Sequence, residues 1–360
     1  MKNLLIVSFF VLFACSKKEE PQPANELYFP PSGSNWESVT PASLGWDESK
    51  IPDLKTFLAS SNSRALIVLK DGKIVIEEYS GKQLANTTLN FTASSNWYWA
   101  SAGKTLTSAL VGIANGEGKI NFDAKSSDYL GTGWTNLTAT QESKITIRHQ
   151  LTMTTGLDDG VPNPDCTAKL CLTYKADPGT RWAYHNAPYT LLDGVIANAT
   201  GKTLNTYVVE QIQLKIGMDG QYLKTGDNNI YYSTPRSMAR FGLLLLNKGK
   251  WEQTQIIPDS YYTQMTTSSQ DINVSYAYLT WLNGKTSYRI PTSQVLFPGA
   301  LSPNAPADMV AAMGKNGQIV NIVPSKNIVV VRMGDDPGTS LVPFLFQDDL
   351  WKKLSLIIKD

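Results

Sequence analysis

Hydrophobic positions near both ends of the chain follow the pattern of β-hairpins. Four short runs rich in β-branched residues predict strands, and they cover residues 65–69, 73–79, 318–323 and 328–333. Asp71-Gly72 separates the first two runs and is typical of a tight hairpin turn. A further strand over Met309–Met313 followed by Asn316-Gly317 predicts one more turn of this kind. We therefore expect antiparallel strands at both ends of the chain.

The middle of the chain follows helical spacing instead. Leu106, Ala109, Leu110 and Ile113 recur at the spacing of one helical face, and glycines follow them. Other predicted helices cover 47–59, 191–200, 237–246 and 344–358.

These elements predict an α/β (α+β) fold. The simplest packing pairs the terminal strands in one antiparallel sheet flanked by the first and last helices. The resulting mixed lobe covers about 41–100 and 285–360, and an all-helical lobe covers about 101–284. A cleft between two such lobes is a usual place for a ligand.

The N-terminus predicts export. Lys2 precedes a short apolar run over 4–14, which is too short to span a bilayer and is typical of the hydrophobic region of a signal peptide, here over 1–14. Cys15 follows Ala14 directly, as in the lipobox of bacterial lipoproteins, so we expect lipidation of Cys15; the alternative is a plain secretory signal. Residues 15–40 are rich in Pro, Ser and Asn and predict a tether between the membrane and a domain over 41–360. We expect a lipid-anchored protein of the cell envelope.

Composition and charge limit the kinds of partner that we expect. The formal net charge of +1 gives no field that would attract nucleic acid or an anionic membrane surface, so the expected membrane contact is the lipid anchor alone. Cys166 and Cys171 can close a small disulfide loop in an exported chain, or stay as two thiols. No His or Cys partner lies near them in sequence, so we expect no metal site, and nothing in the sequence indicates a cofactor.

The first candidate for chemistry is Ser101-Ala102-Gly103-Lys104, at the predicted start of a helix. A spacing of three places Ser101 and Lys104 on one helical face. A serine hydroxyl needs a base to become a nucleophile, and a buried lysine can have its pKa depressed far enough to serve as one. The Ser101 backbone N–H at a helix start also favours a developing oxyanion. The alternative is an N-cap serine with a solvated lysine.

Two further segments carry candidate residues. Tyr184-His185-Asn186 offers a phenol that could shuttle a proton and an amide that could bind Lys104 or a substrate; alternatively, these are a buried tyrosine and a turn asparagine. Gly314-Lys315 precedes Asn316-Gly317, where a strand edge beside a nucleophile could supply backbone N–H groups even if the segment is also a hairpin turn. We expect His149 to support packing and His185 to face away from the other motif residues.

Taken in this order, the three segments resemble the serine β-lactamase and penicillin-recognising family. The S-x-x-K motif at Ser101 and Lys104 matches the first family motif, and Tyr184-x-Asn186 matches the tyrosine form of the second. The resemblance extends from about residue 40 to the end through several further segments: 151–157, Pro178-Gly179, 199–202, 233–242 and Val323-Pro324. Within the family the chain is most similar to the branch of esterases and 6-aminohexanoate-oligomer hydrolases.

The resemblance implies a fold and a set of site residues. The fold is a mixed lobe with an antiparallel sheet plus an all-α lobe. Ser101 would be acylated, Lys104 and Tyr184 would move its proton, and Asn186, Gly314 and Lys315 would bind the substrate. The substrate would be a small ester, amide or peptide, with no cofactor.

The third family motif departs from its usual Lys or His, Thr, Gly pattern. Lys315-Asn316-Gly317 can be read as that motif, but the strand over 318–324 is the better anchor and places Ala312-Met313-Gly314 there. The Lys315 backbone N–H is then the second oxyanion donor. This register lacks the side chain with which relatives hold a β-lactam carboxylate, which argues against penicillinase activity.

The sequence is therefore compatible with three functions. The leading prediction is a serine hydrolase of small esters or amides. A D-Ala-D-Ala carboxypeptidase or weak β-lactamase would need a carboxylate-binding cation in the cleft, which only Lys315 could supply. A non-catalytic cell-envelope binding protein would be expected to lack part of the Ser101, Lys104 and Tyr184 set, which is intact here.

Overall fold

A six-stranded antiparallel sheet organises one lobe of the molecule. The computed structural model describes residues 27–338 and 343–359. The sheet has the order β2-β1-β13-β12-β11-β8. Its strands are β1 (Ser63–Lys70), β2 (Lys73–Tyr79), β8 (Trp281–Leu282), β11 (Val310–Gly314), β12 (Gln318–Val323) and β13 (Ile328–Gly334). Because β1 pairs with β13, with Leu69 opposite Val329, the hairpins from the two ends of the chain lie side by side, as the sequence predicted.

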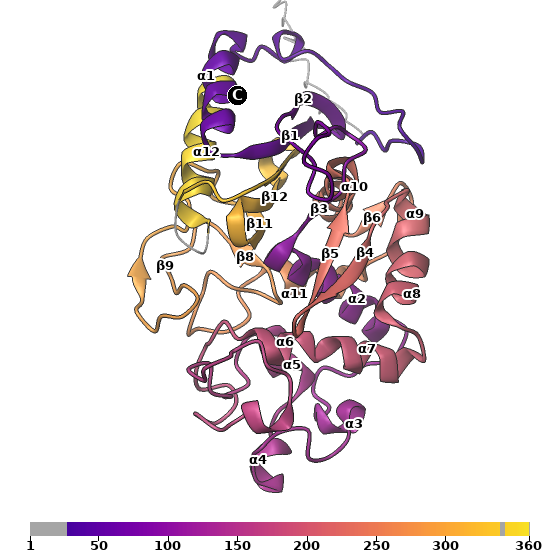
Figure 1. The fold of residues 1–360 in the computed structure, drawn as a ribbon, viewed down its shortest axis with the longest axis vertical. Helices are drawn as coiled ribbons and strands as arrows, with labels where there is room; N and C mark the ends of the chain where they lie inside the picture. Colours follow the sequence, from indigo (N-terminus) through magenta and orange to yellow (C-terminus); the bar gives the residue numbers. More distant parts are fainter. Residues whose placement is uncertain (1–26, 339–342, 360) are drawn as a thin grey trace, which may run out of the picture.

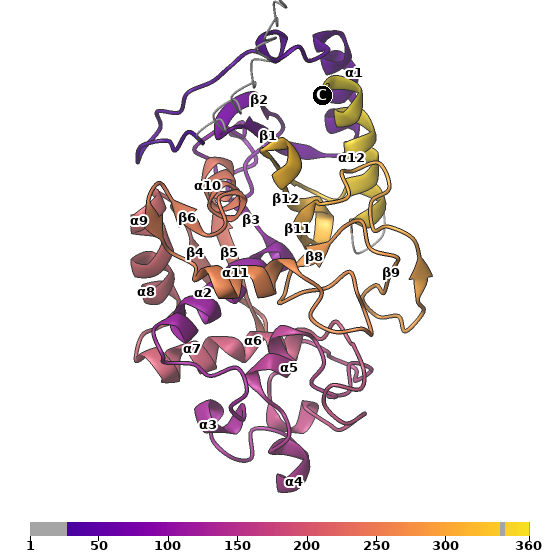
Figure 2. The same cartoon turned by 180° about the vertical axis from the view of Figure 1, so that it is seen from behind.

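Successive side chains of the central strands point to opposite faces of the sheet and pack in two separate apolar layers. Leu66 and Val68 of β1 pack in the layer beneath α1 (Ile51–Ser60) and α12 (Phe344–Ile357). Ile67 and its odd-numbered neighbours point to the opposite face and join the larger core. The prediction that the first and last helices cover the sheet is therefore confirmed, as Figures 1 and 2 show.

The second face of the sheet is covered by α10 (Pro235–Leu246). This helix contacts β12 and β13, and the predicted division had placed it in the helical lobe. Gly242 allows the close approach, since a Cβ at that position would lie 2.5 Å from Val329 Cγ1. The helix therefore belongs to the mixed lobe, and the sheet is a middle layer between two helical layers.

The other lobe is mainly helical, and the long α2 (Gly103–Gly116) runs through the centre of the molecule (Figure 1). The remaining helices are α3 (Ser127–Leu130), α4 (Ala139–Glu142), α5 (Ile147–Leu151), α6 (Asn186–Thr190), α7 (Leu192–Thr200), α8 (Leu204–Val208), α9 (Leu214–Ile216) and α11 (Asp259–Thr266). Every residue of α2 from Gly103 to Ala114 is buried, including the polar residues Lys104, Thr105, Thr107 and Ser108, so α2 is a core helix.

The lobe predicted as all-helical also contains strands. A three-stranded sheet of order β3-β5-β4 lies beside α2 and α8. The small strands are β3 (Trp97–Tyr98), β4 (Gln221–Thr225), β5 (Asn228–Ser233), β6 (Lys250–Trp251), β7 (Thr254–Gln255), β9 (Ser287–Tyr288) and β10 (Phe297–Pro298). The expectation of an all-α lobe was wrong at this sheet, whose strands carry many polar residues that do not alternate clearly with apolar ones.

Residues 27–40, predicted to be part of a tether, lie against the domain. Tyr28 N–H donates to Asp71 O at 2.9 Å, and the Trp36 indole donates to Gly72 O at 2.8 Å. Ser38 forms a β-bridge with Ile74. Composition alone could not reveal these contacts, because they are backbone hydrogen bonds to a distant hairpin. The predicted signal peptide and Cys15 lie outside the described residues.

Within the part of the chain that the structure describes, no helix is long and apolar enough to cross a membrane.

Candidate active site

A cavity of about 370 Å³ lies where the two lobes meet. Its wall is formed by the turn before α2, the end of β11, the start of α6, part of β5 and the loops around residues 159–165 and 291–292. Ser101, Lys104, Tyr184, Asn186, Gly314 and Lys315, the six predicted catalytic and substrate-binding residues, all line it. The fold thus brings together residues from three segments that span more than 200 positions of the chain.

Ser101 sits in a one-turn 3₁₀-helix, η3 (Ala100–Ala102), that leads directly into α2. Ala100 before it has a φ of 46°, a left-handed conformation that is uncommon for a residue with a side chain. Strain of this kind persists only where the surrounding structure imposes it, and it often marks functional sites. Here the backbone is fixed on both sides, since Trp99 N–H donates to Tyr231 O and Ala102 N–H donates to Trp99 O.

Lys104 Nζ lies 2.9 Å from Ser101 Oγ, one helical turn away as the spacing predicted. The lysine is 4% exposed. Burial lowers the pKa of its amine to about 7, and the negative charge of Asp165 raises it by less. A large share of Lys104 is therefore neutral near pH 7, the form that can accept the proton of Ser101.

Aromatic rings enclose the Lys104 amine. Its Nζ lies 4.8 Å from the centre of the Tyr184 ring and 4.4 Å from that of Tyr189. Trp281 stacks on Tyr184, with ring centres 5.8 Å apart. The rings keep water from the amine while offering π faces that attract its charged form.

Tyr184 is placed as a neutral phenol. Burial raises its pKa above the ordinary value, and the neighbouring Ser101 hydroxyl lowers it by less. Lys104 faces the ring of Tyr184, and that contact does not produce a phenolate. Burial therefore keeps the Tyr184 side chain protonated, and the phenol is suited to donating a proton.

Asn186 opens α6 and turns its side-chain amide toward the loop before the disulfide. Its Nδ2 donates to Asp165 Oδ1 at 2.7 Å. Its Oδ1 is buried and has no hydrogen-bond partner among the described residues, which leaves an acceptor at the cavity wall. No hydrogen bond joins Asn186 and Lys104 in the described structure, so substrate binding is the remaining use predicted for this amide.

The two histidines lie outside the catalytic group. His185 is 2% exposed, both of its ring nitrogens are without partners among the described residues, and burial lowers its pKa to about 4. His149 caps α5, where its Nδ1 accepts a hydrogen bond from Thr146 N–H at 3.1 Å. Neither histidine lines the cavity.

Gly314 ends β11 directly against the nucleophile turn. A Cβ at this position would lie 2.4 Å from Trp99 O and 3.0 Å from Ser101 N, so only glycine fits. β11 and β12 pair in the register that places Gly314 opposite Gln318. The Lys315 backbone therefore follows at the edge of the site, while its side chain is exposed.

The strand before Gly314 is apolar where relatives are expected to carry a cation. Ala312 and Met313 are buried, and Met313 lines the cavity. Among the described residues of the cavity wall, Lys315 is the only basic residue besides Lys104.

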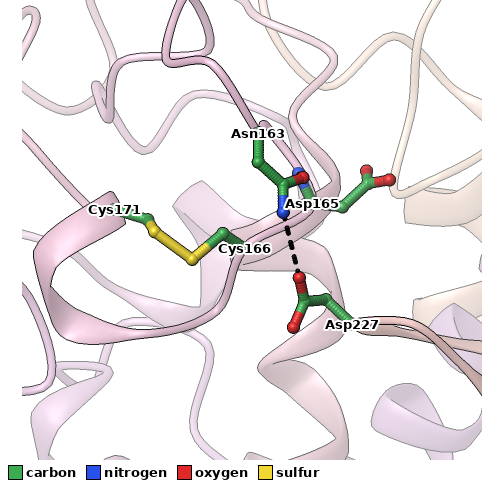
Figure 3. Close-up of a disulfide and its surroundings, with 5 residues drawn as sticks. All are labelled: Asn163, Asp165, Cys166, Cys171 and Asp227. Atoms are coloured by element: carbon green, nitrogen blue, oxygen red, sulfur yellow. Dashed lines mark hydrogen bonds between the residues drawn. A yellow bond between two sulfur atoms is a disulfide. The ribbon is translucent and has the colours of Figure 1, made fainter.

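A disulfide joins Cys166 and Cys171, with a Cα–Cα distance of 5.9 Å. Figure 3 shows it beside Asn163, whose amide donates to Asp227 at 3.1 Å. The bond closes the loop that follows Asp165 and so limits the movement of a residue in the cavity wall.

Sequence reasoning missed three residues of the site. Asp165, Tyr189 and Trp281 line the cavity and lie close to Lys104 or its aromatic wall. Only Asp165 had a local signal, its position immediately before the predicted disulfide loop. The other two belong to no motif and reach the site through the packing of the lobes. Among the described residues no group of three or more His, Cys, Asp or Glu is arranged to hold a metal ion.

Comparison with known proteins places the chain in a family. The Beta-lactamase family model matches residues 56–341, and the chain therefore belongs to this family of hydrolytic serine enzymes. A sequence comparison with curated proteins gave no match at the significance required.

Solved structures share the fold over most of the chain. A protein from Bacillus anthracis provisionally assigned as a 6-aminohexanoate-dimer hydrolase is 19% identical, with a TM-score of 0.66 over 93% of this chain and 91% of that one. A penicillin-binding protein from Bacillus halodurans is 18% identical, with a TM-score of 0.61 over 82% and 98%. EstCE1, described as a hydrolase with promiscuous acyltransferase activity, is 12% identical, with a TM-score of 0.64 over 87% and 99%. The family and fold predicted from the sequence are thereby confirmed.

Proposed function

We propose that this protein is a serine hydrolase that cleaves small esters or amides through an acyl-enzyme on Ser101. The observation that carries the proposal is the position of the Lys104 amine. This amine is buried, its pKa is lowered to about 7, and it lies 2.9 Å from Ser101 Oγ. A serine needs such a base within hydrogen-bond distance, and no histidine is available in the described cavity wall.

In the proposed acylation step, Ser101 Oγ attacks the substrate carbonyl while its proton passes to Lys104 Nζ. The Ser101–carbonyl bond forms, the bond to the leaving alcohol or amine breaks, and the leaving atom takes a proton from the neutral phenol of Tyr184. Lys104 then holds the proton that restores Tyr184. Water repeats the sequence in reverse and releases the acid.

The backbone N–H groups of Ser101 and Lys315 are the proposed donors to the oxyanion. The support is the close approach of Gly314 to Ser101 N and the place of Ser101 in the first turn of η3, where its N–H has no acceptor within the helix.

Labelling with a fluorophosphonate probe tests the nucleophile. Mass spectrometry of the digested protein should find the adduct on Ser101, and Ser101→Ala should neither label nor hydrolyse p-nitrophenyl butyrate. An adduct on another serine would overturn the assignment. A folded wild type that neither labels nor turns over any ester or amide would instead favour a non-catalytic binding protein.

The second candidate is a D-Ala-D-Ala carboxypeptidase or weak β-lactamase. Both act on substrates with a carboxylate, and the apolar Ala312 and Met313 leave only the exposed Lys315 to bind it. Nitrocefin and a D-Ala-D-Ala peptide in the same substrate panel separate the candidates. We expect kcat/KM on both to fall well below that on the butyrate ester.

We further propose that the protein is exported and anchored by a lipid on Cys15. The support is the short apolar run that ends at Ala14-Cys15. Expressed in a bacterium, the wild type should partition with membranes and Cys15→Ala should not. Equal partitioning of the two proteins would contradict the anchor.

A further inference from the structure

The turn that carries Lys315 is hydrogen-bonded to a buried arginine. This turn is η6 (Lys315–Gly317), which joins β11 to β12 and bears the proposed second oxyanion donor. Arg332 of β13 is 0% exposed, and its Nη1 donates to Asn316 O and to Gly317 O. Two consecutive carbonyls of the turn therefore point into the protein interior at the same side chain.

The other donors of Arg332 are also used, although within residues 27–338 and 343–359 it forms no ion pair. Nη2 donates to Ser61 O at 2.6 Å and to Asp335 O at 3.1 Å, and Nε donates to Ser63 Oγ at 3.0 Å. A buried charge of this kind is costly, and an apolar side chain of similar size is often the more stable choice. The arginine is therefore better explained by the backbone that it holds than by the stability that it adds.

Two glycines make room for the guanidinium. A Cβ on Gly317 would lie 2.8 Å from Arg332 Nη1, and a Cβ on Gly334 would lie 2.6 Å from Arg332 Cζ. The ring of Phe346 packs against the same group, with Cζ 4.7 Å from the ring centre. The planar fork is therefore confined, and it can hold the turn in one geometry.

A second buried side chain binds the same turn. Gln318 is 0% exposed, and its Nε2 donates to Gly334 O at 2.6 Å and also reaches Asn316 O at 3.2 Å and Lys315 O at 3.3 Å. Each carbonyl of η6 thus accepts from Arg332 or Gln318. Because peptide planes are rigid, these bonds leave the Lys315 backbone little freedom to rotate. The Lys315 N–H is the first of η6 and has no acceptor within that helix, so it can serve an oxyanion.

The middle of the turn is tied to the segment of the nucleophile. Asn316 Nδ2 donates to Tyr98 OH at 2.8 Å, and Tyr98 stands three residues before Ser101. Asn316 has a φ of 63°, a left-handed conformation that few residue types besides glycine adopt readily. The segments that supply the two proposed oxyanion donors are therefore joined by a side-chain hydrogen bond.

We propose that Arg332 is a positioning residue that sets the direction of the Lys315 N–H by holding the carbonyls of η6. The proposal rests on the proposed function, because it assigns a task at the same acyl-transfer site. Arg332 does not line the cavity, so it acts on the reaction only through the turn. Without it, the carbonyls of the turn lose a charged donor, and the Lys315 N–H moves away from the place of the oxyanion.

The test compares p-nitrophenyl butyrate with its thiono analogue, in which sulfur replaces the carbonyl oxygen. Sulfur is larger and accepts hydrogen bonds weakly, so well-placed N–H donors favour the oxygen ester. The readout is the ratio of kcat/KM for the oxygen ester to that for the sulfur ester. A change in the base Lys104 or in the folded fraction alters both esters alike and leaves this ratio unchanged.

Arg332→Met should lower kcat on the oxygen ester by about 10- to 100-fold, less than the loss of a whole donor, and should lower the ratio by a similar factor. KM should stay within about 3-fold, since the donor acts in the transition state. Arg332→Lys should recover little, because an ammonium lacks the planar fork that spans the carbonyls. Tyr98→Phe removes only the acceptor of Asn316 and should give a smaller loss in the same ratio.

Arg240→Met is the matched control. Arg240 is also a buried arginine that donates to backbone carbonyls, and it does not line the cavity. This variant should lose stability but keep kcat and the ratio within about 3-fold of the wild type. An equal loss of the ratio in Arg240→Met would mean that any buried arginine has this effect, which would overturn the proposal.

The remaining outcomes separate the two proposals. A wild-type ratio in Arg332→Met overturns the positioning role, and so does a wild-type ratio in Arg332→Lys, which decides the matter if the methionine variant does not fold. Turnover and fluorophosphonate labelling of the wild type at Ser101 would still support the hydrolase in either case. A folded wild type that neither labels nor turns over the oxygen ester would overturn the proposed function, and the role of Arg332 with it.

Discussion

At the scale of single residues, the site depends on what burial does to ionisable groups. Burial lowers the pKa of Lys104 to about 7 and raises that of Tyr184, so near pH 7 about half of Lys104 is neutral and Tyr184 is a neutral phenol. The proposed proton-transfer group then consists of the neutral amine of Lys104, the phenol of Tyr184 and the hydroxyl of Ser101. Ser101 and Lys104 are one helical turn apart, and Tyr184 comes from a separate segment. Three side chains that share a proton should behave as a unit under mutation.

The first prediction concerns the acid limb of the pH profile. The ester kcat/KM should rise with pH through about 7, because only the neutral form of Lys104 accepts a proton.

Lys104→Ala and Tyr184→Phe should each reduce kcat by about 10²- to 10⁴-fold, the usual range for acid–base catalysis, and the double variant should be little worse. Lys104→Arg should not restore activity, since guanidinium stays charged. A Tyr184→Phe protein with wild-type kcat would remove the phenol from the mechanism.

The second prediction concerns His185, which is buried and follows Tyr184 directly in the chain. Its pKa is about 4 in the folded protein, below the ordinary 6.5, so the unfolded state binds the proton first. Stability due to this group is complete above pH 6.5 and is lost as pH falls toward 4, by at most about 3 kcal/mol.

Urea unfolding at pH 7 and pH 4.5 measures the effect in the wild type and in His185→Gln. The glutamine variant should lose less stability between these two pH values, because its side chain does not titrate. Equal losses would contradict a lowered pKa of His185 in the folded protein. Asp193 titrates in the opposite sense, since burial raises its pKa to about 7, and it is unchanged between the two proteins.

At the scale of elements, the end of β11 and the start of η3 form one structural unit. Trp99, Ser101 and Ala102 all lie within 3.0 Å of the place where a side chain on Gly314 would begin. The strand therefore positions the nucleophile turn by direct backbone contact.

The third prediction follows from this contact. Gly314→Ala should lower kcat by about 10²- to 10³-fold, the cost of losing an oxyanion donor, because the methyl group must push β11 away from Ser101. Gly103→Ala is the matched control, since a Cβ there would lie 3.6 Å from its nearest neighbour, Tyr231 Cβ. The control should keep kcat within a few-fold and a melting temperature close to that of the wild type. If both variants behave alike, the approach of β11 has no catalytic role.

The elements that the sequence predicted are those with a local pattern. The two hairpins and α2 were recognised because turn residues and helical spacing lie within a few positions of one another. The sheet of β4 and β5 was missed because strands such as Gln221–Thr225 are mostly exposed and polar.

The candidate site divides in the same way. Ser101 and Lys104 are one turn apart in sequence and could be found by spacing alone. Asp165, Tyr189 and Trp281 join them only through the packing of separate segments, and no local rule relates them. A single sequence therefore identifies the chemistry of the site more readily than the wall that selects its substrate.

At the scale of the whole molecule, a buried arginine ties the first described residues to the centre. Arg240 of α10 is 2% exposed, and its guanidinium donates to Pro30 O at 3.0 Å, Pro31 O at 2.6 Å and Ile216 O at 2.9 Å. Nearby, Arg236 donates to Ser34 O at 2.5 Å and forms two hydrogen bonds with Glu77 of β2. Together these arginines explain why a segment that is polar in composition lies firmly on the domain.

The fourth prediction is that Arg240→Met lowers the free energy of unfolding by about 2–4 kcal/mol, because several carbonyls lose a charged donor at once. Lys55→Met is the control. It breaks an ion pair with Glu78 at 2.7 Å that is largely exposed, and it should cost less than about 1 kcal/mol. Guanidinium chloride unfolding of both variants measures the difference. Similar losses would mean that the N-terminal segment contributes little to stability.

The aromatic enclosure of Lys104 has a consequence for covalent labelling. With a pKa of about 7, this amine is half unprotonated at pH 7, whereas an ordinary surface lysine is unprotonated to only about one part in a few thousand. A small electrophile such as cyanate can reach Lys104 from the cavity that this residue lines. Brief carbamylation at neutral pH should therefore mark Lys104 before the other lysines, and the dependence of that marking on pH would report its pKa without any substrate being known.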